Sequence, residues 1–97
     1  MNVRFRSSQL RRCYEQIDLA QRTWGTVVGE RYTTRITQIF SASSISDLHA
    51  LRSLRLHPLT GERRGQYAMT LQAQWRLIIS LVDDDTTMIE EVSNHYD

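Results

Sequence analysis

No lysine occurs among the 97 residues of the chain, and cysteine and proline occur once each. A single cysteine, Cys13, cannot form an internal disulfide, and it excludes metal sites built from several cysteines. No apolar run approaches the roughly 18 residues that a membrane-spanning helix needs. The early arginines are not followed by the apolar stretch of a secretory signal. We therefore expect a cytoplasmic protein with no membrane association.

Length and composition indicate one domain over residues 1–97. Hydrophobic residues make up 40% and charged residues 24% of the chain. These fractions are ordinary for globular proteins, and they exclude wholesale disorder and fibrous repeats. A chain of this size is too short for two independent cores.

Charge is distributed unevenly along the chain. All 12 basic residues are arginines in residues 1–82, which carry a net charge of +7, whereas residues 83–97 carry −6. This asymmetry predicts a basic surface beside an acidic end. Guanidinium groups bind phosphate bidentately where an ammonium cannot, but codon bias would account for the missing lysine equally well.

The first half of the sequence predicts a strand and two helices. Residues 2–5 alternate apolar and polar side chains, as an edge strand does. Ser7 or Ser8 can cap a helix over residues 10–24, whose apolar residues recur three or four apart. A second amphipathic helix after Gly25 completes a helical hairpin.

The second predicted helix has one apolar face and one polar face. Its apolar residues recur at helical spacing, and Arg31, Arg35 and Gln38 lie off that face. The apolar face consists of Val28, Tyr32, Ile36, Ile39 and Phe40.

The second half of the sequence predicts strands. After a short helical turn near residues 45–51, a strand at residues 54–56 ends at His57-Pro58 because proline cannot donate to a ladder. Strands at residues 67–71, 75–82 and 87–92 follow, and the last should place Met88, Glu90 and Val92 on one face. The predicted fold is α+β, with an N-terminal strand, a two-helix hairpin and a three- to four-stranded antiparallel sheet, the helices packed on one face.

Strong enzyme motifs do not occur. There is no glycine-rich phosphate loop, no zinc-ligand spacing and no nucleophile elbow. The three aspartates at residues 83–85 are more typical of a solvated hairpin turn than of a metal site. We expect neither a metal nor a cofactor.

Two histidines are candidates for acid–base chemistry, since imidazole titrates near neutral pH. His57 ends a predicted strand, and His95 follows the last one. The alternative roles are a loop histidine bonded to backbone for His57 and a mobile terminal residue for His95.

Arginines and a tyrosine provide further candidates. Arg63, Arg64 and Arg76 supply positive charge, and Arg76 alternates with Trp75 on its strand. Arg76 could stabilise a phosphorane-like transition state, or it could form a surface ion pair with Glu90 or Glu91. Tyr96 lies beyond the last strand and could stack on a base.

The second half also resembles a known family. A leucine-histidine-proline-leucine segment at residues 56–59 leads into the glycine-bracketed turn at residues 61–65, and Trp75-Arg76 opens the next strand. A histidine, His95, follows the last predicted strand. This arrangement over residues 50–95 resembles HigB-type toxins of the RelE superfamily.

The resemblance implies a function. Such toxins enter the ribosomal A site and cut messenger RNA without a metal, using the 2′-hydroxyl as nucleophile. They are neutralised in a hetero-oligomer by an antitoxin, often a helix-turn-helix protein of the HigA kind. The resemblance places the catalytic groups at His57, Arg76 and His95, while Arg63, Arg64 and Tyr96 would bind RNA.

The sequence departs from the family in one place. The family often has an acid and a tyrosine before the terminal histidine, where this chain has Ser93 and Asn94. Two alternatives therefore stay open: a non-catalytic toxin that inhibits DNA gyrase, as the ParE branch is thought to do, and an interaction domain of weakened activity.

Overall fold

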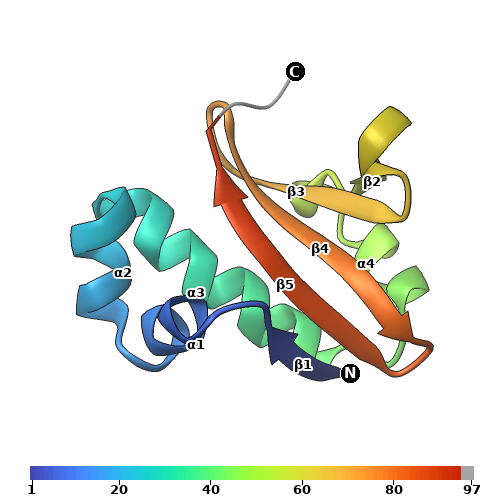
Figure 1. The fold of residues 1–97 in the computed structure, drawn as a ribbon, viewed down its shortest axis with the longest axis horizontal. Helices are drawn as coiled ribbons and strands as arrows, with labels where there is room; N and C mark the ends of the chain where they lie inside the picture. The colour runs from blue at the N-terminus through green and yellow to red at the C-terminus, as the bar shows by residue number, and fades with distance from the viewer. Residues whose placement is uncertain (95–97) are drawn as a thin grey trace.

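The structure is a computed structural model, and it describes residues 1–94. Within this range one sheet packs against a layer of helices (Figure 1). The elements in chain order are β1 (Asn2–Phe5), α1 (Ser8–Glu15), α2 (Ile17–Trp24), α3 (Thr26–Ser41), α4 (Ile45–Ala50), the 3-10 turn η1 (Arg52–Leu54), β2 (His57–Pro58), the 3-10 turn η2 (Gly61–Arg63), β3 (Gln66–Gln72), β4 (Trp75–Asp83) and β5 (Thr86–Ser93).

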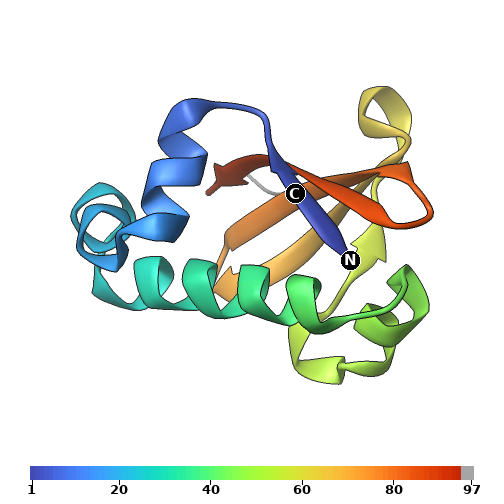
Figure 2. The ribbon, with the colours of Figure 1, turned by 90° about the horizontal axis from the view of Figure 1, so that it is seen from below.

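The sheet has the strand order β1-β5-β4-β3-β2. β1 runs parallel to β5, and the other neighbours are antiparallel. Figure 2 shows α3 crossing one face of this sheet. The predicted α+β architecture is confirmed, with the N-terminal strand closing a mixed sheet of five strands.

The core lies between α3 and the sheet. The predicted apolar face of α3 is confirmed for its four wholly or almost wholly buried members, whereas Phe40 is 44% exposed. Tyr67 and Trp75 pack against this core, and Cys13 is completely buried within it. The buried side chains that face one another across this layer are Val28, Tyr32, Ile36, Ile39, Met69, Leu71, Leu77, Ile79 and Ile89.

The single helix expected over residues 10–24 is two helices. Gln16 has extended backbone angles, φ −129° and ψ 98°, which separate α1 from α2. The break allows α2 to press against α3 at Gly29, where an added Cβ would lie 2.5 Å from the backbone nitrogen of Gln21. As a result Ile17, which fitted the helical period, is 44% exposed.

The strand expected at residues 54–56 is also wrong. Residues Arg52–Leu54 form a 3-10 turn, and Arg55 has a left-handed φ of 50°, which breaks the extended chain. The strand β2 begins only at His57 and pairs with Ala68 and Tyr67 of β3.

The faces of β5 differ from simple alternation because of a bulge. Ile79 pairs with Ile89 and Ile78 pairs with Glu91, so Glu90 has no residue opposite it. An extra residue of this kind shifts the alternation by one position. Ile89 and Val92 therefore both contact the core, and Glu90 does not share a face with Val92 as expected.

Arg35 is buried although its position lies off the predicted apolar face. Its side chain reaches β3, where Nε donates to the carbonyl of Thr70 at 3.1 Å. Burial lowers the pKa of Arg35, and the neighbouring charge of Arg31 adds to this effect. Arg31 itself donates to the carbonyl of Leu71 at 2.8 Å. The two arginines tie α3 to the end of β3.

No helix in residues 1–94 is both long enough and apolar enough to cross a bilayer.

Candidate functional site on the polar face of the sheet

The side of the sheet away from the helices, called the polar face below, brings together residues from β2, β4 and β5. Paired residues of neighbouring strands project to the same side. One row runs through His57, Ala68, Ile78 and Glu91. The adjacent row runs through Thr70, Arg76 and Ser93.

His57 and Arg76 therefore lie on the same face. They are two strands apart, which is about 10 Å across the sheet, and one row apart, about 7 Å along it. Side chains of this length can converge on a group lying between them. The structure thus brings together two of the three predicted catalytic residues.

His57 is half-buried, and its ring has a defined orientation. Nδ1 lies 2.9 Å from the carbonyl oxygen of Arg55. Because a carbonyl only accepts, Nδ1 is the donor, and the neutral ring carries its lone pair on Nε2. A backbone bond of the kind considered for His57 is present, and with Nδ1 as its donor the basic ring nitrogen is Nε2.

Arg76 is half-buried at the start of β4. Its guanidinium donates to the backbone carbonyls of Ala73 and Trp75, the second at 3.0 Å. Within residues 1–94 it forms no ion pair with Glu90 or Glu91, whose ion pairs are with Arg6 and Arg63. Two backbone oxygens of the β3–β4 turn thus hold the guanidinium in position at the start of β4.

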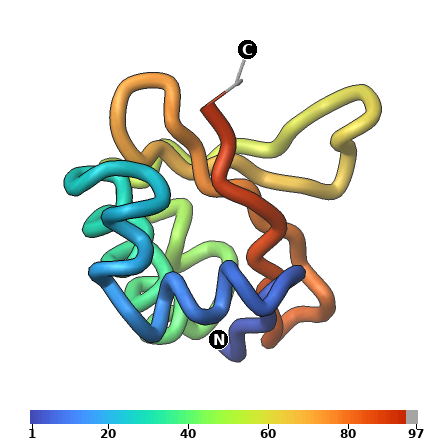
Figure 3. The backbone as a smooth tube through the Cα atoms, turned by 60° about the vertical axis from the view of Figure 1, so that its left-hand side comes forward, coloured from blue at the N-terminus to red at the C-terminus, as the bar shows by residue number. Residues whose placement is uncertain are grey.

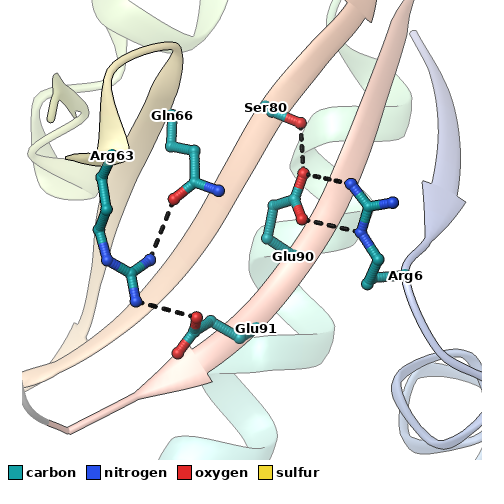
Figure 4. A network of polar contacts seen from close by, with 6 residues as sticks. All are labelled: Arg6, Arg63, Gln66, Ser80, Glu90 and Glu91. Atoms are coloured by element: carbon teal, nitrogen blue, oxygen red, sulfur yellow. Dashed lines mark hydrogen bonds and ion pairs between the residues drawn. The ribbon is translucent and has the colours of Figure 1, made fainter.

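Arg63 extends from η2 toward β5 (Figure 4). Its guanidinium donates to the side-chain oxygen of Gln66 at 3.0 Å and to the carboxylate of Glu91 at 3.0 Å. Figure 3 shows that the connection between β2 and β3, drawn in yellow, stands out from the rest of the chain. The ion pair therefore fixes a projecting loop relative to the row that contains His57.

A second network links β1 to β5. Arg6 donates through two nitrogens to the two carboxylate oxygens of Glu90, both at 3.0 Å, and Ser80 donates to the same carboxylate at 2.6 Å (Figure 4). The hydrogen bond from Arg6 lowers the pKa of Glu90 against an opposing effect of burial. The same contact raises the pKa of Arg6.

Sequence reasoning missed Arg6 as a member of this face. The sequence did contain one clue, the consecutive glutamates Glu90 and Glu91 within a predicted strand. In a regular strand one of the two would face the core, so both can point away from it only where the strand has a bulge. Arg64, predicted to bind RNA, is exposed directly after η2 and beside Arg63.

The predicted residues His95 and Tyr96 lie outside the described residues. The last residue of β5, Ser93, pairs with Arg76. In residues 1–94, no group of three or more histidine, cysteine, aspartate or glutamate side chains is arranged to hold a metal ion.

A mixed sheet with helices on one face is the fold that this chain shares with solved toxin structures. YafQ from E. coli strain BL21(DE3) superposes with a TM-score of 0.67 at 18% identity, over 97% of this chain and 92% of YafQ. A YoeB/ParE toxin from Agrobacterium tumefaciens gives 0.59 at 16% identity, over 99% and 100% of the two chains. The YoeB–YefM complex from Staphylococcus aureus gives 0.56 at 17% identity, over 99% and 98%.

Sequence comparison points the same way. Endoribonuclease HigB from Proteus vulgaris is 29% identical over 66 residues, which are 68% of this chain and 71% of HigB. No protein-family model matches the chain. Sequence and fold together confirm the expected resemblance to HigB-type toxins of the RelE/ParE superfamily.

Proposed function

We propose that residues 1–97 form the toxin of a toxin–antitoxin pair, and that it cuts messenger RNA in the ribosomal A site by metal-independent acid–base chemistry. The observation that carries this proposal is the placement of His57 and Arg76 in adjacent rows of one sheet face. The relative HigB is named an endoribonuclease, and this supports the same reaction for the present chain.

The proposed reaction is an attack of the 2′-oxygen on the adjacent phosphorus. His57 takes the proton of the 2′-hydroxyl on Nε2, which its bond to Arg55 leaves as the basic nitrogen. The P–O5′ bond breaks, His95 supplies the proton to the departing 5′-oxygen, and a 2′,3′-cyclic phosphate remains. Arg76 stabilises the charge that develops on the phosphoryl oxygens.

RNA binding is assigned to residues that flank this centre. Arg63 and Arg64 lie at the projecting loop, where guanidinium groups can bind backbone phosphates. Tyr96 would stack on a base. Arg63 must exchange its bond to Glu91, or share it, when a phosphate arrives.

We further propose a cognate antitoxin as partner. The Staphylococcus aureus neighbour is a complex of YoeB with YefM. The antitoxin of the present chain should cover the polar face with acidic groups, since that face carries Arg63 and Arg76. From the HigB resemblance we expect it to be a HigA-like helix-turn-helix protein acting in the cytoplasm.

Primer extension on messenger RNA after induction tests the proposal. The parent should produce cuts in frame with codons, and His57→Gln should reduce them by about 10²-fold or more, the usual contribution of a general base. His49→Gln is the matched control, because His49 is exposed on α4 and its ring contacts Tyr67 at its edge. His95→Gln should behave as His57→Gln.

The outcomes separate the candidate functions. Intact messenger RNA together with inhibited DNA gyrase would favour the ParE-like alternative. Intact messenger RNA with retained antitoxin binding and no growth arrest would favour an interaction domain. Cleavage that EDTA abolishes would overturn the metal-independent mechanism.

A further inference from the structure

We propose a second phosphate-binding site at the sheet edge, between β1 and the start of α1, that holds a backbone phosphate of RNA. The site rests on the proposed function, because it assumes that the polar face accepts an RNA strand. A cavity of about 380 Å³ occupies this position. Its size lies within the range of ligand-binding clefts.

The cavity, called the β1–α1 cavity below, is lined mainly by cationic and hydroxyl groups. Arg4, Arg6 and Arg11 contribute three guanidinium groups, and Ser7 and Ser8 contribute hydroxyls. The Ser7 hydroxyl caps α1 by accepting from the backbone of Leu10 at 3.2 Å, which fixes the turn between Arg6 and Arg11. Guanidinium forks match phosphate oxygens bidentately.

The positive charge of the β1–α1 cavity is only partly compensated. Residues 1–14 contain four arginines and no acidic residue. Glu90 neutralises Arg6 and holds its side chain in place. Within residues 1–94, Arg4 and Arg11 are exposed and form no ion pair. Two guanidinium groups therefore face solvent at a cavity whose third guanidinium is fixed.

One arginine of the β1–α1 cavity, Arg4, belongs to the polar face. Arg4 pairs with Met88, which pairs with Ser80, so Arg4 projects to the side that carries Arg76. Figure 1 shows β1 next to β5, and α1 follows β1 in the chain. The apolar neighbours on β1, Val3 and Phe5, pack against the core and also line the cavity.

Strand spacing separates the two sites. His57 on β2 and Arg4 on β1 lie at opposite edges of the sheet, four strand spacings or about 19 Å apart. One phosphate cannot contact both, so the β1–α1 cavity takes a different phosphate from the one that is cut. That phosphate belongs either to the same messenger strand or to ribosomal RNA.

The test compares two double variants of equal charge loss. Arg4→Gln/Arg11→Gln removes the solvent-facing guanidiniums of the cavity. Arg12→Gln/Arg22→Gln removes two exposed arginines that do not line it. Binding is measured over a salt series with two probes, a 2′-O-methylated single-stranded oligoribonucleotide that cannot be cut and ribosomes carrying messenger RNA.

The cavity variant should bind at least one probe on the order of tenfold more weakly, and its plot of log K against log salt should be shallower by about 0.7, the value for one phosphate on a single strand. The control should stay within twofold of the parent. A loss on the oligoribonucleotide identifies messenger RNA as the source of the phosphate, and a loss confined to ribosomes identifies ribosomal RNA.

Two results would overturn the site: equal losses in both double variants, or a parent that binds neither probe. Arg4→Lys/Arg11→Lys keeps the charge, and it replaces the glutamine variant if that variant does not fold. Its affinity for the RNA probes should lie between the affinity of the parent and the affinity expected for the glutamine variant. Because binding is measured without cleavage, a parent that binds RNA through the cavity but cuts none would contradict the proposed function alone.

Discussion

The two sides of the sheet are built on different principles. On the helical side, α3 packs apolar residues against β3, β4 and β5, and one buried arginine, Arg35, bonds to backbone. On the polar face, side chains from η2, β4 and β5, and Arg6 directly after β1, form ion pairs and hydrogen bonds across long sequence separations. Apolar packing determines the side-chain positions on the helical side, whereas ion pairs and strand register determine them on the polar face.

This difference assigns the stability of the fold mainly to the helical side and the proposed chemistry to the polar face. Burial of apolar area on the helical side supplies the free energy of folding. The exposed pairs on the polar face contribute little to stability. Substitutions on the two sides should therefore affect different measurements.

The largest effect is expected at Arg76. Arg76→Ala should slow messenger cleavage by about 10²-fold or more, because a guanidinium would no longer stabilise the charge on the phosphoryl group. Single-turnover cleavage on ribosomes measures this, with Arg22→Ala as the exposed control. A rate within twofold of the parent would assign Arg76 a structural role, and the two sides would then not differ as described.

The next largest effect concerns the contact between α2 and α3. Gly29→Ala should lower the free energy of unfolding by about 2 kcal/mol, because the new methyl group would overlap the backbone of Gln21. Denaturant titration measures this change. Thr34→Ala, exposed on the same helix, should stay within about 0.5 kcal/mol of the parent. An unchanged Gly29→Ala variant would mean that the two helices can separate freely.

Removal of the buried guanidinium should cost somewhat less. Arg35→Met retains the aliphatic volume but leaves the carbonyl of Thr70 without its side-chain donor, so we expect a loss of about 1–3 kcal/mol. Arg22→Met is the exposed control. Equal stability of the Arg35→Met variant and the parent would show that water replaces the guanidinium at Thr70.

The smallest effect is a pH dependence on the polar face. Arg6 lowers the pKa of Glu90 in the folded protein, so the carboxylate stabilises the fold above its unfolded pKa of about 4.3. This contribution is lost as the pH falls below that value and through the lower folded pKa. The melting temperature of Glu90→Gln should therefore fall less steeply with acid than that of the parent. If the melting temperatures of the two proteins fall in parallel with pH, the Arg6–Glu90 pair does not contribute to the loss of stability in acid. Glu62→Gln provides the control.

The elements with regular periods were predictable from the sequence. The strands containing Tyr67 and Trp75 alternate clearly, and the apolar face of α3 recurs at helical spacing, so local pattern and final packing agree. The break at Gln16 could not be predicted in this way, because it depends on how closely α2 approaches Gly29. The bulge at Glu90 equally depends on pairing with β4.

The candidate site was predictable only in part. His57 and Arg76 were found through a local motif, and strand register then placed them on one face. Arg6 was not found, because the consecutive glutamates do not identify residue 6 as the partner of Glu90 before the parallel pairing of β1 with β5 is known. Arg35 was misplaced because its acceptor, the carbonyl of Thr70, is a tertiary contact that no helical period contains.

The complete burial of Cys13 has a practical consequence. It is the chain's only thiol, and in the folded state it lies out of reach of maleimide and similar reagents, which attack exposed thiolates. A cysteine introduced at Arg64 would thus be the single labelling position on the native protein. The fluorescence polarisation of a fluorophore attached there would increase when another macromolecule binds at the projecting loop.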